Sequence, residues 1–222
     1  MNSLKGYRAI VTSGPTYEPI DPVRFIGNRS SGKQGHAIAE ALSKHGADVT
    51  LITGPVSIPD PKGVKTIHIE TAAEMLETVQ NALPADIAVC AAAVSDWAPV
   101  TVQNHKIKKR DNASAPSITL KENPDILKTL SNHTKRPQIV VGFAAETENL
   151  EANARAKISK KSCDFILANL VQNGAESVFG SNENHVYLID MESAEDWGKM
   201  SKHAIADRLC TTLIEHVKKG QK

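Results

Sequence analysis

Short apolar runs alternate along the chain with longer segments in which apolar residues recur every three or four positions. Runs typical of buried strands lie at 8–14, 48–53, 64–70, 86–94, 138–143, 163–170 and 185–190. Segments with helical periodicity lie at 30–46, 71–83, 123–133, 147–162 and 201–219. This alternation predicts an α/β fold, a doubly wound, largely parallel, Rossmann-like sheet with helices on both faces.

Several local signals fix the expected ends of these elements. Thr71 followed by Glu74 is a capping box at the start of the second helix, and Gly46 is the expected stop of the first. Asn123 precedes a proline and is the expected cap of the third helix. Three prolines between residues 15 and 22 predict a loop after the first strand.

The polar stretches of the chain predict excursions from this sheet. Residues 97–117 are mostly polar and irregular, and the segments 97–122 and 171–184 are expected to be mobile. The chain has no internal repeat and no low-complexity segment. We therefore expect one domain over residues 1–222, with 97–122 as a lysine-bearing flap.

Composition excludes several classes of function. Lys and Arg number 26 against 25 Asp and Glu, and aromatic residues make up 4% of the chain, so a nucleic-acid-binding protein is not expected. No apolar run reaches about 18 residues, so no membrane span is expected. Three widely spaced cysteines favour a reducing, cytoplasmic location over a disulfide framework or a zinc site.

Ligands of such sheets bind at the carboxyl ends of the strands, so phosphate-binding motifs were sought there. Residues 27–33 match GxxxxGK, but Gln34 stands where a P-loop has Ser or Thr, and the preceding strand ends too early. The dinucleotide motif GxGxxG is absent. What remains is Ser30-Ser31-Gly32 at a helix start, which predicts an anion site for phosphate or, alternatively, a plain serine cap.

Other charged and polar residues are weaker candidates when each is taken alone. Lys106, in a lysine-rich run that ends at Arg110, is placed either to close over a polyphosphate or to form a solvated face. Asp96 follows a buried strand and is either a ligand of ribose or base or a turn residue. Arg24 and Asn28 suit an anion and an acyl oxygen. No metal ligands can be named from the sequence.

Taken together, the motifs closely resemble phosphopantothenoylcysteine synthetase of the bacterial, CTP-dependent type. The resemblance runs in order from about residue 8 to residue 190. It rests on six motifs: Ser13-Gly-Pro-Thr16, Glu18 to Lys33, Ala91 to Asp96, Lys106-Ile-Lys-Lys109, Asn123-Pro-Asp-Ile126 and Gly142 to Thr147.

This resemblance implies a ligase of coenzyme A biosynthesis. The carboxylate of 4′-phosphopantothenate would attack the α-phosphate of CTP, giving an acyl-cytidylate and pyrophosphate, and the amine of L-cysteine would then displace CMP. It further implies Mg²⁺ with the nucleotide, a homodimer, and a flavin-dependent decarboxylase domain in the full-length protein, with no flavin in this chain.

The resemblance also assigns the site residues. Asn28 would orient the acyl-cytidylate, with Arg24 supporting its loop, and Lys106 would reach the CTP phosphates. The phosphate cradle would be Ser30, Ser31 and Gly32. The remaining contacts to the nucleotide would come from Cys90, Ala91, Ala92, Asp96, Pro124, Asp125, Ile126, Leu127, Phe143, Lys157 and Lys161.

Three alternatives remain open on the sequence alone. The same ligation could use ATP, because base choice depends on the geometry of the pocket. A non-catalytic module would bind the nucleotide without turnover. An NAD(P)-dependent reductase would need a Tyr-xxx-Lys pair, and no tyrosine of this chain has a lysine four residues later.

Overall fold

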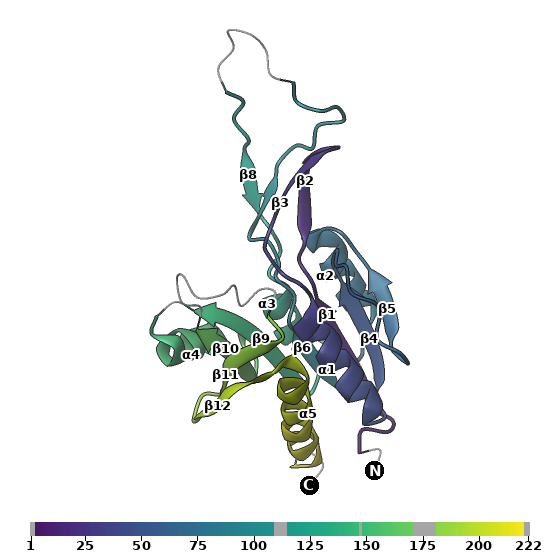
Figure 1. Ribbon diagram of the computed structural model, residues 1–222, viewed down its shortest axis with the longest axis vertical. Helices are drawn as coiled ribbons and strands as arrows, with labels where there is room; N and C mark the ends of the chain where they lie inside the picture. Colours follow the sequence, from purple (N-terminus) through teal and green to yellow (C-terminus); the bar gives the residue numbers. More distant parts are fainter. Residues whose placement is uncertain (1–2, 109–114, 147, 171–180, 220–222) are drawn as a thin grey trace.

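The computed structural model describes residues 3–108, 115–146, 148–170 and 181–219. An eight-stranded sheet forms its centre, with strand order β12-β11-β10-β9-β6-β1-β4-β5 (Figure 1). The strands are β1 (Arg8–Ser13), β4 (Asp48–Thr53), β5 (Lys65–His68), β6 (Ile87–Cys90), β9 (Ile139–Glu146), β10 (Phe165–Leu170), β11 (Glu183–Ile189) and β12 (Ala194–Ser201). The helices are α1 (Lys33–Lys44), α2 (Ala72–Asn81), α3 (Ile126–Ser131), α4 (Leu150–Lys161) and α5 (Lys202–Lys219).

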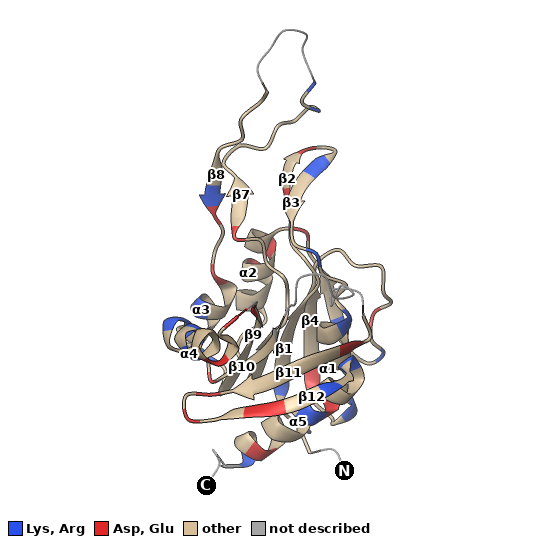
Figure 2. Cartoon of the chain, turned by 60° about the vertical axis from the view of Figure 1, so that its left-hand side comes forward, with Lys and Arg blue, Asp and Glu red and all other residues tan. Residues whose placement is uncertain are grey.

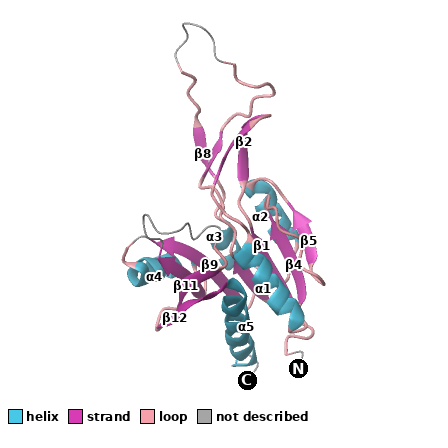
Figure 3. Cartoon of the chain, viewed as in Figure 1, coloured by secondary structure: helices cyan, strands magenta, loops and turns pink. Residues whose placement is uncertain are grey.

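The sheet is parallel from β5 through β10, and β11 and β12 extend it as antiparallel strands. Helices α1 and α5 cover one face, while α2, α3 and α4 cover the other (Figure 3). The expected doubly wound, Rossmann-like fold is confirmed. The strand β12 was not expected, because its sequence AEDWGKMS is mostly polar, as suits an exposed edge.

Alternate residues of the strands feed two separate hydrophobic cores. Val11 and Val89 face α1 and α5, whereas their neighbours Ile10 and Ala88 face α2, α3 and α4. All four side chains are almost fully buried. A strand that is buried on both faces reads as a continuous apolar run, which is why these strands were visible in the sequence.

The chain reverses direction across the sheet between β1 and β6. From β1 it proceeds outward through β4 and β5, and after α2 it crosses to β6 on the other side of β1. A bridge between Pro15 and Ala93 continues the pairing of these two strands into their loops. Such a reversal opens a crevice at the carboxyl ends of the strands, where ligands of this fold class bind.

A long arm projects from this carboxyl edge (Figure 1). It consists of the hairpin β2 (Tyr17–Asp21) and β3 (Arg24–Gly27), the ribbon β7 (Trp97–Pro99) and β8 (Leu120–Glu122), and the described residues 100–108 and 115–119. The expected loop at residues 15–22 is therefore wrong in part: Pro19 lies within β2 and Pro22 just after it, in a two-stranded hairpin whose edges tolerate proline.

The structure corrects two further expectations at element ends. The predicted strand 86–94 ends at Cys90, and the following residues leave the sheet as a loop. The cap of α3 is Asp125, whose carboxylate accepts a hydrogen bond from the Lys128 N–H at 2.9 Å, and Asn123 instead donates to the Ser95 carbonyl. The capping box of Thr71 and Glu74 is confirmed.

None of the described helices is both long and apolar enough to cross a membrane.

Candidate active site

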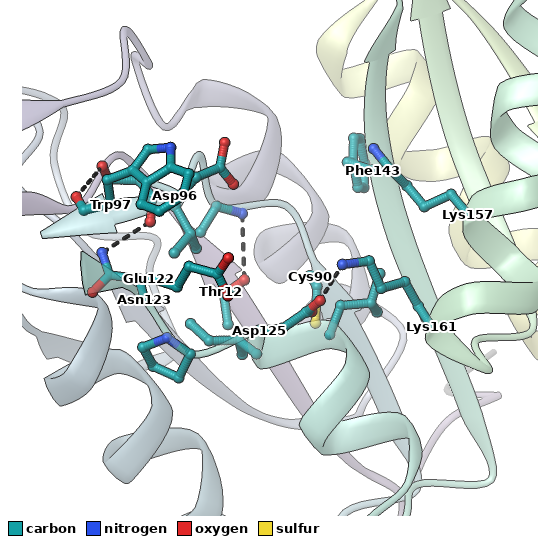
Figure 4. Close-up of a pocket in the computed structure, with 16 residues that line it drawn as sticks. Thr12, Cys90, Asp96, Trp97, Glu122, Asn123, Asp125, Phe143, Lys157 and Lys161 are labelled. Carbon is teal, nitrogen blue, oxygen red and sulfur yellow. Dashed lines mark hydrogen bonds and ion pairs between the residues drawn. The ribbon is translucent and has the colours of Figure 1, made fainter. Parts of the chain in front are cut away.

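One cavity lies where β1, β6 and β9 end beside α3 and α4, and we call it the α3 cavity (Figure 4). Its volume is about 380 Å³. The sequence-predicted residues that line it are Cys90, Ala92, Asp96, residues 124–127, Phe143, Lys157 and Lys161. Small side chains on the strand ends leave room above the sheet, and Phe143 offers an aromatic surface beside it.

A second cavity adjoins the first at the start of α1, and we call it the α1 cavity. Its volume is about 430 Å³. The sequence-predicted residues that line it include Asn28, Ser30, Ser31, Gly32 and Ala91. The two cavities share Ala92, Val94, Asp96, Phe143 and Lys157. A molecule longer than either cavity can therefore extend from one into the other without leaving the carboxyl edge.

The turn that enters α1 is held by a buried polar contact with β1. Gly32 caps the helix in the left-handed conformation, with φ of 70°, and no side chain serves as the cap, so the plain serine cap is wrong. The Ser13 hydroxyl donates to the Gly32 carbonyl at 2.9 Å, and His36 Nδ1 lies 3.1 Å from both groups. Ser30 and Ser31 line the cavity, and the Ser30 hydroxyl accepts a hydrogen bond from the Gly32 N–H at 3.3 Å.

Helix α1 approaches β1 very closely at this point. A Cβ atom on Gly35 would lie 2.4 Å from the Ser13 hydroxyl oxygen, so only glycine allows this packing. Desolvation lowers the pKa of His36, partly offset by its hydrogen bond to the Gly32 carbonyl. His36 is therefore neutral at neutral pH, where it contacts the turn that enters α1.

Two lysines one helical turn apart on α4 reach the α3 cavity from the side. Lys161 forms an ion pair with Asp125, and Lys157 lies 3.7 Å from Glu146. Figure 2 shows that cationic residues gather on α4 beside this edge. Lys157 also lines the α1 cavity, so it is placed to neutralise a charge at the junction between the two.

Cys90 lies where β6 ends, and it faces the α3 cavity (Figure 4). Burial, together with the nearby Cys163 and Asp125, raises the pKa of its thiol to about 12. The thiol therefore stays protonated at neutral pH, so Cys90 lines the α3 cavity without being an activated nucleophile.

The loop after β6 is fixed by hydrogen bonds from neighbouring segments. The Ala92 N–H donates to the Thr12 hydroxyl at 3.3 Å, and the Ser95 N–H donates to the Thr16 hydroxyl at 2.9 Å. Asn123 donates to the Ser95 carbonyl at 2.9 Å. These contacts hold Asp96 at the wall shared by both cavities.

Asn28 follows β3 and returns from the arm to the α1 cavity. Its Nδ2 donates to the Val94 carbonyl at 2.8 Å, and Val94 belongs to both cavities. This contact ties the end of the arm hairpin to the loop after β6.

Arg24 and Lys106 line neither cavity of this chain. Arg24 lies on β3, where its guanidinium binds Asp21 and donates to the Ile107 carbonyl at 2.8 Å. The Ile107 N–H donates back to Asp21 at 3.1 Å. Lys106 is exposed on the arm next to this anchor, while Lys109 and Arg110 of the same run lie outside the described residues.

Sequence reasoning missed several residues of the two cavities. Thr12, Trp97 and Glu122 line the α3 cavity, and Asn169 and Lys202 line the α1 cavity. Thr12 lies next to a recognised motif and could have been included on that ground. Nothing in the sequence around Lys202 marks it as part of a cavity.

The donor set is poor in metal ligands. Within residues 3–108, 115–146, 148–170 and 181–219, no group of three or more His, Cys, Asp or Glu side chains is arranged to hold a metal ion.

Comparison with curated proteins finds close relatives among bacterial enzymes. The chain is 40% identical over 215 residues to the coenzyme A biosynthesis bifunctional protein CoaBC of Vibrio cholerae, covering 96% of this chain and 54% of the relative. It is 48% identical over 188 residues to the CoaBC protein of Bacillus subtilis, covering 83% of this chain and 45% of the relative. The chain thus spans about half the length of the curated relatives it matches.

Comparison with solved structures agrees with this relationship. The crystal structure of the C-terminal domain of CoaBC matches with a TM-score of 0.82 at 33% identity, covering 99% of this chain and all of that one. A Cab2 mutant in complex with phosphopantothenate-cysteine shares the fold, with a TM-score of 0.73 at 19% identity, over 97% of this chain and 89% of that one. Residues 4–217 match the family described as DNA/pantothenate metabolism flavoprotein C-terminal domain, so the chain belongs to this family.

Proposed function

We propose that this chain is a phosphopantothenate–cysteine ligase of coenzyme A biosynthesis, with CTP as the activating nucleotide. The observation that carries the proposal is the pair of adjoining cavities at the carboxyl edge, which share Asp96, Phe143 and Lys157. A ligase of this kind must hold a nucleotide and an acyl donor end to end. The names of the CoaBC relatives and of the Cab2 complex agree with this chemistry.

The α3 cavity is the proposed site of the nucleoside. Pro124, Ile126, Leu127 and Phe143 form an apolar wall for the base, and the small residues Cys90 and Ala92 allow it to approach the strand ends. The resemblance of the motifs to the bacterial, CTP-dependent type supports CTP over ATP. Lys157 and Lys161 are one turn apart on α4 and suit successive negative groups of the nucleotide.

In the first step, an oxygen of the substrate carboxylate attacks the α-phosphorus. A new P–O bond forms, the bond to the bridging oxygen breaks, and pyrophosphate leaves with the electron pair. The residues around the junction act by charge neutralisation and positioning. Lys157 lies at the junction, and the turn at Ser30, Ser31 and Gly32 presents hydroxyl groups to the departing anion.

In the second step, the amine of cysteine attacks the acyl carbon, a C–N bond forms and CMP leaves with the electron pair. The amine also loses a proton, and no side chain of this chain is assigned as its base. Negative charge develops on the acyl oxygen during this attack. Asn28 lies beside the α1 cavity and carries an amide that suits that oxygen.

Mg²⁺ is proposed to arrive with the triphosphate, whose charge it reduces. Asp96 fits this arrangement, because it is a carboxylate at the wall shared by the two cavities. Asp96 would then contribute one ligand or hold a metal-bound water.

A homodimer built through the arm is part of the proposal. Most of the large apolar side chains that are exposed among the described residues lie on the arm: Val23, Phe25, Trp97, Val100, Val102, Ile118 and Leu120. Such a patch is typical of an interface. Lys106 is exposed and lines neither cavity of its own chain, so we propose that it reaches the cavities of a second copy, while Arg24 supports the arm through its bonds to Asp21 and Ile107.

The relatives are bifunctional and about twice as long as this chain. We therefore propose a flavin-dependent decarboxylase domain as a covalent or separate partner, and a cytoplasmic location for both. Neither a nucleic acid nor a membrane is among the proposed partners.

Release of pyrophosphate from CTP and 4′-phosphopantothenate with Mg²⁺ tests the proposal. We expect a steady rate that depends on cysteine, and a single-turnover burst in its absence. Activity with ATP alone would keep the ligase and overturn CTP. If neither nucleotide released pyrophosphate, even with a decarboxylase partner added, the chain would be a nucleotide-binding module.

A further inference from the structure

Two helices begin with a lysine at the same cavity. Lys33 opens α1 and Lys202 opens α5, and both residues line the α1 cavity. Asn182 links the two, because its side chain accepts a hydrogen bond from Lys33 Nζ at 2.8 Å and its carbonyl accepts one from the Lys202 N–H at 2.9 Å. The first turn of a helix disfavours positive charge, so two cations at two helix starts are unusual.

Lys202 is the more unusual of the pair. It is only 8% exposed, and its ammonium has no hydrogen-bond or ion-pair partner among the described residues. Burial and the nearby charge of Lys33 lower the pKa of Lys202. Burying most of a lysine side chain without a counter-charge is costly, and residues of this kind are normally paired or bind an anion.

The remaining wall of the α1 cavity is rich in donors. Arg29 and Lys157 add two further cations, and Asn169 and Asn184 add side-chain amides. Among the described residues that line this cavity, Asp96 is the single carboxylate. Several cations facing one carboxylate fit a ligand group that carries about two negative charges, which is the charge of a phosphate monoester or of a terminal phosphate.

We propose that Lys202, supported by Lys33, binds a phosphate group of a substrate in the α1 cavity. The bound anion offsets the burial of the Lys202 side chain, its repulsion from Lys33 and its position at the start of α5. This proposal rests on the proposed function, which offers two sources of the phosphate. They are the terminal phosphates of the nucleoside triphosphate and the phosphate of 4′-phosphopantothenate.

Calorimetric titration of the full chain with inorganic pyrophosphate and with inorganic phosphate tests this site without requiring turnover. Lys202→Met keeps the length of the side chain and removes its charge. We expect it to weaken binding of at least one anion tenfold or more. Lys218→Met, at an exposed position of the same helix, removes an equal charge and should leave both affinities within twofold.

Lys202→Arg retains the charge and should keep the affinity within about threefold of the original chain. Unchanged anion affinity in a folded Lys202→Met variant would overturn the proposal, and so would equal weakening in Lys218→Met. If Lys202→Met did not fold, Lys202→Gln would provide the same comparison. These outcomes are independent of ligase activity, so they are distinguishable from failure of the proposed function.

In the active ligase, steady-state kinetics of Lys202→Met identifies the source of the phosphate. A tenfold rise in KM for CTP would assign the site to the triphosphate, and the same rise for 4′-phosphopantothenate would assign it to the acyl substrate. A fall in kcat with both KM values unchanged would contradict a phosphate-binding role.

Discussion

The carboxyl edge of the sheet and the projecting arm differ in the exposure of their apolar side chains. At the edge, Ile87 and Val89 of β6 are fully buried, and the cavities above them are lined by residues held in place from several elements. On the arm, Phe25 is 50% exposed and Val100 is 53% exposed. One chain therefore assembles the two cavities by itself, whereas it leaves the arm surface uncovered.

The two regions also differ in their electrostatics. The arm is anchored by Asp21, whose carboxylate binds Arg24 and the backbone of Val23 and Ile107. The Arg24 guanidinium, with help from these backbone groups, holds the pKa of Asp21 well below its usual range. The anchor thus stays charged at pH values where an ordinary aspartate takes up a proton, whereas the α1 entry contains a histidine whose pKa is lowered by desolvation. The comparison predicts different responses to substitution and to pH.

Substitution of Asn28 should have the largest effect, because this residue lies where the two regions meet. Asn28→Asp places a negative charge where the acyl oxygen becomes negative, and it removes the donor to the Val94 carbonyl. We expect the second step to slow by about 100-fold or more. Single-turnover measurement of pyrophosphate release and of amide formation separates the two steps.

A matched control is Asn132→Asp, at the end of α3 and outside both cavities. It should leave both steps within twofold. If Asn28→Asp slowed pyrophosphate release as much as amide formation, Asn28 would serve general positioning and not the acyl oxygen.

Removal of the charge at Lys106 should have the next largest effect, and it tests whether the arm takes part in chemistry. Lys106→Gln deletes one charged contact to the nucleotide phosphates, which corresponds to a loss of about 10- to 100-fold in pyrophosphate release. Lys121→Gln removes a charge from the exposed β8 strand of the same arm and is the control. Normal release in Lys106→Gln would make Lys106 an ordinary solvated residue.

The difference between the regions also explains what could be predicted from the sequence. The central strands of the sheet are buried on both faces, so continuous apolar runs reveal them, and the capping box of α2 is a local signal carried by Thr71 and Glu74. Strands β7 and β8 are only three residues long, which is too short for a periodic pattern. The arm was therefore predicted as irregular.

Prediction of the candidate site had a similar limit. Residues near strand ends, such as Asn28 and Asp96, carry a positional signal because parallel strands end at one edge. Lys202 carries none, because it stands in a polar stretch and its burial depends on the packing of α5 against α1. Asn123 fitted a helix cap by sequence, but the helix starts two residues later, which frees its amide to hold the loop after β6.

An apolar-to-charged substitution on the arm should have a milder effect, because it acts on assembly alone. Val102 is 48% exposed on the arm and Met191 is 56% exposed on the sheet side of the molecule. Val102→Asp should weaken the proposed dimer by about tenfold or more, because a carboxylate would be buried at the interface. Sedimentation velocity at several concentrations measures this effect.

Met191→Asp is the control for that experiment, because it introduces the same charge at an exposed apolar residue away from the arm. Its dimer affinity should match that of the original chain. Equal weakening by both substitutions, or a monomeric original chain at all concentrations, would remove the arm as the assembly surface.

Acidification should produce the smallest effect, and it should act on the carboxyl edge before it acts on the arm. The pKa of His36 is lowered from its ordinary value of 6.5, chiefly because the ring is desolvated, although Asp60 acts in the opposite direction. The unfolded chain therefore binds the proton more readily than the folded chain. Stability is lost as pH falls through 6.5 toward the lower folded value, whereas Asp21 keeps its charge over the same range.

Thermal unfolding between pH 7.5 and 5.5 measures this response. We expect His36→Gln to have a flatter dependence of Tm on pH than the original chain, because Gln cannot take up the proton. His105→Gln, at an exposed position on the arm, should leave the slope unchanged. If the two variants gave equal slopes, protonation of His36 would not limit the stability of the α1 entry, and the contrast between the edge and the arm would rest on packing alone.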